Sequence, residues 1–250
     1  MTTSENHPPN ELEIPVKRFV LASVILGVAA APGLALPPSN ARTLEHAKEV
    51  LDELSSLRIK GIPTKLLAEA EGIAIIPRVV KAGFIFGGRG GHGLVMSRNK
   101  DGTWSDPGFV NLGGASVGFQ AGIESTDVVL VFRTRKSLDR LLEGKGKVTL
   151  GADAAIAAGP IGRMAAAATD ARMEAEILSY SRSRGLFAGV SLDGAVINAD
   201  AKSNAKFRSS PEDMKLADGL KARLAEMSGG KPAASPPLPP VLNPPVPPKP

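Results

Sequence analysis

A glycine-rich run at residues 88–93, GRGGHG, fits the spacing GxGxxG that lets a phosphate approach the N-terminus of a helix in dinucleotide-binding proteins. That chemistry requires a strand before the run and a helix after it. Here the run is followed by LVMSR (residues 94–98), which is strand-like, and no βαβ pattern surrounds it. We therefore interpret residues 88–93 as a glycine-rich bend between two strands, at which Arg89 could meet an anionic group.

The residues that most often carry catalysis or bind metals form no recognisable pattern. Neither His92 nor His46 has a metal-ligand partner at useful spacing. The chain has no cysteine, which excludes disulfides, thiolate sites and lipid attachment to cysteine, and it has no GxSxG motif. We expect no metal, no cofactor and no enzymatic activity. A hydrolase remains a third alternative, and it would need a cleft that brings His92 within hydrogen-bond reach of a serine and a carboxylate.

Several basic residues lie at the edges of the sequence motifs described below, and they are the candidates for binding an anion. The formal net charge of +5 favours anionic partners such as membrane headgroups or acidic polymers. Nucleic acid is not expected, because one Trp and one Tyr offer few surfaces for base stacking. The candidate lipid-binding residues are Lys60, Lys65, Arg78, Lys81, Arg89, Arg182 and Arg184.

The region from Gly72 to Arg133 alternates short β-branched and glycine-rich runs, which predict strands. The expected strands cover residues 73–76, 84–86, 94–96, 110–112, 117–120 and 128–132. Residues 137–142 predict one or two helical turns. We expect an α+β fold in which a mostly antiparallel, curved, barrel-like and glycine-rich sheet is flanked by helices.

Residues 180–200 predict a β-hairpin whose two-residue turn is Asp193-Gly194. The Ala- and Gly-rich residues 151–168 predict a strand and then a helix. Trp104 is expected to be half-buried and to anchor the packing of a turn.

Two amphipathic helices flank this region. Residues 43–58 carry an apolar stripe opposite an acidic face, which favours packing on the sheet over insertion into a membrane. Residues 210–228 begin with Ser210-Pro211-Glu212-Asp213, which combines a capping hydroxyl, a proline at the first position and acids in the first turn.

The two ends of the chain have the composition of processing and linker segments. Residues 1–35 contain Lys17-Arg18 and an apolar run, which predict a signal peptide, with an uncleaved N-terminal anchor as the alternative. Its removal would leave 28 basic and 22 acidic residues, a formal charge of +6. Residues 36–42 are expected to be a linker. Residues 229–250 predict a proline-rich disordered tail, with docking to a proline-recognition module as the alternative.

Several segments, taken together and in order, resemble the SYLF domain family. They are GIAIIP (72–77), KAGFIFGGRGGHG (81–93), DGTWSDP (101–107), TLGADAAIAAGPIGR (149–163) and YSRSRGLFAGVSLDG (180–194). The resemblance sets the domain at residues 43–208. It implies a binding module found in bacterial exported proteins and in eukaryotic lipid- and actin-associated proteins, with phosphoinositide binding in eukaryotic members.

These observations lead to one expected function and one main alternative. We expect an exported, periplasmic or extracellular protein that lies against a membrane and binds anionic phospholipid or another acidic envelope component. The alternative is a structural envelope protein that self-associates through its Gly- and Ala-rich sheet, which would make it a homo-oligomer. Actin binding is not expected of an exported chain.

Overall fold

The structure, a computed structural model, describes residues 39–56, 61–83, 86–117, 122–142, 146–161, 175–183 and 186–229. The chain divides into a unit before Pro38 and a unit from Pro38 to Pro250, and every described residue belongs to the second. The predicted signal peptide, Lys60, Arg184 and the proline-rich tail lie outside the described residues and stay predictions. None of the helices in the described ranges is long and apolar enough to cross a membrane.

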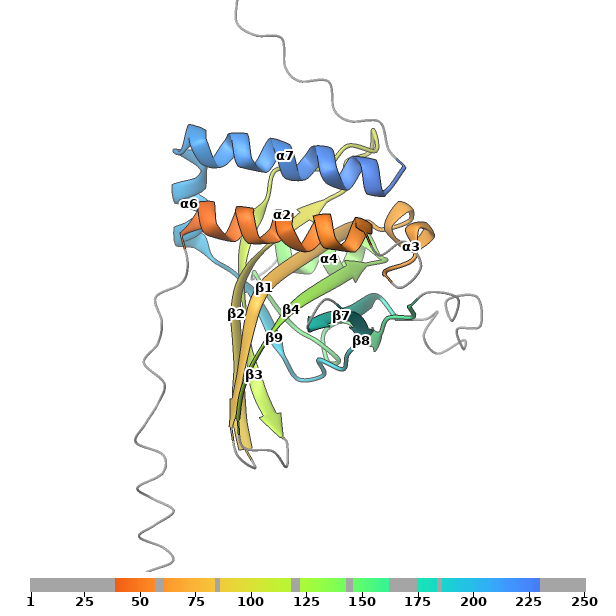
Figure 1. The fold of residues 1–250 in the computed structure, drawn as a ribbon, viewed down its shortest axis with the longest axis vertical. Helices are drawn as coiled ribbons and strands as arrows, with labels where there is room; N and C mark the ends of the chain where they lie inside the picture. Colours follow the sequence, from red (N-terminus) through yellow and green to blue (C-terminus); the bar gives the residue numbers. More distant parts are fainter. Residues whose placement is uncertain are drawn as a thin grey trace, which may run out of the picture. The chain divides into compact units, whose positions relative to one another are not determined.

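Four long antiparallel strands form the centre of the sheet (Figure 1). They are β1 (Gly72–Gly83), β2 (Phe86–Ser97), β3 (Gly108–Val117) and β4 (Gly122–Phe132). Strand β1 pairs with β2 on one side and β4 on the other, and β3 pairs with the free side of β2. The β1–β2 and β2–β3 pairs therefore join strands that are consecutive in the chain, whereas the β1–β4 pair does not.

Shorter strands extend this centre on both sides, giving nine strands within the described ranges. They are β5 (Lys147–Thr149), β6 (Ile156–Ala158), β7 (Ile177–Ser183), β8 (Leu186–Gly189) and β9 (Val196–Ala199). Strand β7 pairs with β4, and β6 joins β7 in parallel, while β9 pairs with β3 and β5 with β9. Because β5 and β6 are consecutive in the chain yet occupy opposite ends of the sheet, the sheet is strongly curled. The predicted α+β class with a curved, barrel-like sheet is confirmed.

Helices cover the two faces of the sheet unequally. They are α2 (Asn40–Ser56), α3 (Thr64–Ala68), α4 (Arg135–Leu142), α6 (Ala201–Arg208) and α7 (Pro211–Met227). Helix α2 packs on β1 and β2, and α7 packs on α2 (Figure 1). We call this side the helix face, and its core includes Ile73 and Ile75. The other side, the inner face, holds Ala74, Ile76 and the apolar side of α4. The alternation follows from the two-residue period of a strand.

Helix α7 begins where the sequence predicts. The Ser210 hydroxyl accepts a hydrogen bond from the Asp213 N–H at 3.3 Å, and Pro211 occupies the first turn. The first helix begins at Asn40, three residues before its predicted start.

Replacing Ser210 with alanine is expected to lower the free energy of unfolding by about 1 kcal/mol, because the Asp213 N–H loses its acceptor at the helix N-terminus. Urea unfolding measures the change. Ser210→Asp, which preserves an acceptor, is the control, and an equal loss in both variants would contradict a capping role.

The predicted hairpin at residues 180–200 is wrong in its pairing. Strand β8 pairs with the preceding strand β7, with Tyr180 opposite Gly189. The Asp193-Gly194 turn exists, since the Ala195 N–H bonds to the Leu192 carbonyl and Gly194 has φ 75°, but it leads to β9 on the other side of the sheet. A two-residue turn signal fixes the local backbone and not the partner of the strands around it.

The glycine-rich run at residues 88–93 lies inside β2 and is not a bend between strands. The strands predicted at 73–76 and 94–96 exist, but each is part of a longer strand, β1 and β2 respectively. Trp104 is more buried than predicted, at 5% exposure. Its ring lies under the Arg98 guanidinium, 4.5 Å from the ring centroid, and its Nε1–H donates to the Ser228 Oγ at 3.4 Å.

Candidate functional site

Strand β1 is interrupted by a bulge at Pro77 and Arg78. The pairing of β1 with β4 shifts register between Ile76 and Val79. Proline cannot donate to the ladder, so a bulge is one of the few places where a central strand accepts it. Arg78 has φ 51°, and among the described non-glycine residues it alone has a positive φ. Left-handed backbone at a non-glycine residue costs of order 1 kcal/mol and needs support from its surroundings.

Asp127 of β4 supplies that support. Its Oδ1 accepts the Arg78 N–H at 2.8 Å, and its Oδ2 accepts from the Arg182 Nε at 2.6 Å. Asp127 and Arg182 are direct cross-strand partners between β4 and β7, and Arg182 also pairs with Glu53 of α2. One buried carboxylate therefore joins the bulge, β7 and, through Arg182, helix α2.

Burial disfavours the ionised forms of Asp127 and Arg182, whereas the contacts between charged groups favour them. Burial raises the pKa of Asp127, while the hydrogen bond from the Arg78 N–H lowers it. Burial likewise lowers the pKa of Arg182, and Glu49 raises it. The geometry, with two donors of Arg182 on the same carboxylate, favours the ionised pair. The charge of Arg182 is thus compensated inside the protein.

A cleft of about 490 Å³ opens beside this group, between α2 and strands β1, β4 and β7. It has mixed charge: its lining includes His46, Glu49, Glu53, Arg78, Asp127 and Arg182. The Arg78 guanidinium is exposed on its rim and makes no ion pair with any residue that the structure describes. The cleft itself is therefore not selective for anions, whereas Arg78 is available to one.

Two further candidates lie on the inner face beyond the bulge. Lys81 of β1 is the cross-strand partner of Arg89 of β2 and, on its other side, of Glu124 of β4. Arg89 Nη1 donates to the Ser191 carbonyl at 3.4 Å, and its Nε is buried without a hydrogen-bond partner in the described ranges. Lys65 stands apart on α3, with its side chain 84% exposed and 3.8 Å from Glu69. The structure thus places Arg78, Lys81 and Arg89 on one strand pair, with Arg78 on the side of α2 and the other two on the inner face.

Lys81 and Arg89 belong to a projecting part of the sheet, which we call the arm, and Arg78 lies in the bulge at its base. The arm comprises residues 79–83, 86–91, 113–117 and 122–126, and it continues past α2 in Figure 1. The pairing of β4 with β7 stops at Asp127, and that of β3 with β9 covers Val110 to Gly113. Within the described ranges, the outer edges of the arm therefore have no neighbouring strand except at Gly113, which pairs with Val196 of β9.

His92 occupies a structural position. Its Nδ1 lies 3.0 Å from the Asn111 Oδ1 and 3.6 Å from the Asp200 Oδ2, and its ring stacks on Phe109 at 5.8 Å. The imidazole is 3% exposed. The Ser203 hydroxyl donates to the Asp200 carboxylate and not to the His92 ring. The pKa of Asp200 is lowered: burial would raise it, but the hydrogen bonds from Ser203, together with the contacts of His92 and Asn111, outweigh burial. This arrangement caps α6 and leaves the imidazole almost fully buried.

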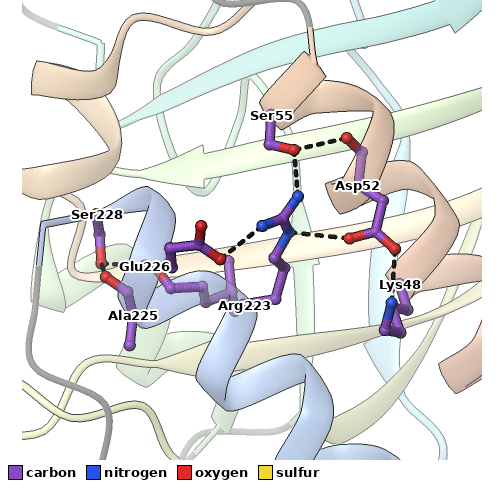
Figure 2. Close-up of polar contacts among 8 residues, drawn as sticks. Lys48, Asp52, Ser55, Arg223, Ala225, Glu226 and Ser228 are labelled. Atoms are coloured by element: carbon purple, nitrogen blue, oxygen red, sulfur yellow. Dashed lines mark hydrogen bonds and ion pairs between the residues drawn. The ribbon is translucent and has the colours of Figure 1, made fainter.

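A second cleft, of about 520 Å³, lies between α2 and α7, and Figure 2 shows the polar contacts around it. Arg223 of α7 contacts Asp52 at 2.9 Å, Glu226 at 2.5 Å and the Ser55 hydroxyl, and Asp52 also pairs with Lys48 at 2.6 Å. The Lys48 contact is the main reason that the pKa of Asp52 is lowered. Since these charges are paired with one another, they hold the two helices together.

Sequence reasoning missed Asp127, the residue with the most connections in the candidate site. No local motif marks it, because its partners lie 49 and 55 positions away. Pro77 offered a signal, because a proline inside an apolar run predicts a bulge. The backbone N–H groups that a bulge leaves unpaired need a side-chain acceptor.

Comparison with known proteins gives the family. Residues 113–233 match the family model Ysc84, described as "Las17-binding protein actin regulator". LAS seventeen-binding protein 3 of Saccharomyces cerevisiae is 44% identical over 148 residues, covering 58% of this chain and 32% of the relative. Human SH3 domain-containing YSC84-like protein 1 is 36% identical over 176 residues, covering 68% of this chain and 51% of the relative. No solved structure matches the chain.

The chain therefore spans about half, or less, of the length of these relatives. The matched residues include the second half of β3, from Gly113, then β4 and the strands and helices that follow it. The order of motifs and the two sets of relatives agree, and the chain belongs to the Ysc84/SYLF domain family.

Proposed function

We propose that this domain is a non-enzymatic binding module that recognises anionic lipid headgroups through its arm. The observation that carries the proposal is that the charges of Arg78, Lys81 and Arg89 are not compensated by described acidic residues. All three lie on β1 and β2, and none makes an ion pair with a described carboxylate. By contrast, Lys221 and Arg223 on the helices are each paired with two acids. Cations without internal partners attract an anionic surface more strongly than paired ones.

Apolar side chains at the same end of the sheet favour a membrane as the anionic partner. Ile123 of β4 is 77% exposed and Val80 of β1 is 43% exposed. Both lie on the helix face, the side on which Arg78 lines the cleft, and exposed apolar residues near a cation are typical of proteins that bind at the membrane interface. We propose that the exported chain uses this end at a periplasmic or extracellular membrane surface.

The test is vesicle co-sedimentation of the full chain with and without anionic lipid, comparing the wild type with Arg78→Gln/Lys81→Gln/Arg89→Gln. Each cation near an anionic surface contributes about 1 kcal/mol, so we expect binding to fall by about two orders of magnitude. Wild-type binding is also expected to weaken with salt, because screening shortens the range of the attraction.

The matched control removes three exposed cations elsewhere, as Lys202→Gln/Lys206→Gln/Lys215→Gln on α6 and α7. It changes the net charge by the same amount. Equal binding losses in both triple variants would mean that net charge and not the arm drives binding. No binding of the wild type to anionic vesicles would overturn the proposal.

A protein partner is the second candidate. The family description names Las17 binding and actin regulation for its members, and the matched span includes β3 and β4 of the arm. Co-sedimentation of the same variants with actin filaments separates the two. Filament binding by the wild type without vesicle binding would favour the protein partner.

A further inference from the structure

The helix face of the arm carries no charged side chain in the described ranges. Beyond the end of α2 it presents Val80 and Ala82 of β1, Gly88 and Gly90 of β2, Gly113 of β3 and Ile123 of β4. The register places Ala82 opposite both Gly88 and Ile123, and Gly90 opposite Val80 and Gly113. No described side chain on this part of the face carries a charge, whereas Lys81, Arg89 and Glu124 all lie on the inner face. We call these six residues the platform.

The three platform glycines are not required by the fold of a single copy. A Cβ on Gly113 would meet nothing within 4 Å, and one on Gly88 or Gly90 would meet only a carbonyl oxygen at 3.9 Å. None of the three has the positive φ that favours glycine. By contrast, a Cβ on Gly91 would lie 2.8 Å from the Ile76 Cγ2 on the inner face. Glycine weakens a strand interior, so unrequired glycines indicate that another backbone approaches from outside.

We propose that the platform is an interface between two copies of this chain, packed face to face. Charge favours a second copy as the occupant. The chain has a formal net charge of +5, so most pairs of surfaces on two copies would repel each other, whereas two platforms bring no charge together. Two sheets normally pack about 10 Å apart, and glycines at the centre of both faces permit a closer approach.

The size of the platform sets the expected strength. A stable interface usually involves about 20–30 residues on each side, and the platform offers far fewer. The dimer is therefore weak in dilute solution, and it forms when the local concentration of the chain is high. This inference does not depend on lipid binding.

Cysteine cross-linking of the full chain tests the geometry, because the chain contains no cysteine of its own. Ala82→Cys places one thiol in the middle of the platform, and Glu124→Cys places one on the opposite face of the same arm. With a short bifunctional thiol reagent and no vesicles, we expect a covalent dimer from Ala82→Cys that increases with protein concentration. Equal cross-linking of the two variants, or none at position 82, would overturn the proposal.

A second pair of variants separates self-association from folding. In the Ala82→Cys background, Gly90→Val/Gly113→Val adds side chains to two residues that face each other across β2 and β3. We expect the midpoint of thermal unfolding to stay equal or rise, and the dimer yield to fall by at least about tenfold, because the added side chains hold the two faces apart. An unchanged dimer yield would contradict the platform. So would a loss of vesicle binding without any change in dimer yield, which would assign the platform to lipid.

Discussion

Replacing Asp127 with alanine is expected to lower the free energy of unfolding by about 3–5 kcal/mol. The change leaves the guanidinium of Arg182 partly buried without its main acceptor, and it leaves the N–H of Arg78 without a partner. The left-handed backbone at Arg78 then loses the contact that supports it. Equilibrium unfolding in urea measures the effect, and the slope of the transition checks that unfolding remains two-state.

Glu53→Ala is the matched control, because Glu53 is the other carboxylate on Arg182 and its side chain is 48% exposed. We expect a loss below about 1 kcal/mol, as for other exposed ion pairs. If both variants lost the same stability, Asp127 would act as an ordinary ion-pair partner and not as the support of the bulge. The variant Asp127→Leu/Arg182→Met removes both charges and should regain only part of the loss, since the Arg78 N–H remains unsatisfied.

Gly93→Ala is expected to destabilise the protein by about 3 kcal/mol, at the upper end for overpacking of a core. Its Cβ would lie 2.7 Å from the Ile76 Cα and also against the Ile75 carbonyl oxygen. Both atoms belong to the backbone of the neighbouring strand β1, which cannot move without disturbing its pairing with β4. Thermal and urea unfolding of the purified variant measure the change.

Gly113→Ala is the control for this prediction, because its Cβ meets nothing within 4 Å. We expect it to be neutral or to stabilise the protein by up to about 1 kcal/mol, since alanine restricts the unfolded chain more than glycine does. A large loss at Gly113 would mean that the strand needs glycine there for a reason internal to one copy, and it would remove the basis of the platform.

The features that the sequence predicts well are those with local causes. The start of α7 depends on the contiguous residues Ser210 to Asp213, and α2 depends on an apolar stripe with helical spacing. The class of the sheet follows from β-branched and glycine-rich runs that are too short for helices. In each case the residues that determine the structure lie within a few positions of one another.

The features that could not be predicted depend on which segments pair. The turn at Gly194 has the expected local form, yet the strands on its two sides lie at distant places in the sheet. Arg182 is basic and therefore a candidate ligand contact from sequence alone. Only the register of β7 on β4 shows that Asp127 compensates its charge. Among the candidate anion-binding residues, the pairing of Lys81 with Arg89 likewise follows from the β1–β2 register and from no motif.

The packing of α2 against α7 joins the first described helix of the domain to the last. During synthesis, α2 leaves the ribosome well before its partner, so its buried residues Leu44, Leu51 and Leu54 lack their full cover until α7 has been synthesised. Contacts of such large sequence separation also slow folding, because the intervening chain must first be ordered. The growing polypeptide therefore exposes the apolar side of α2 until α7 has been synthesised, a state in which chaperones can bind it before the domain closes.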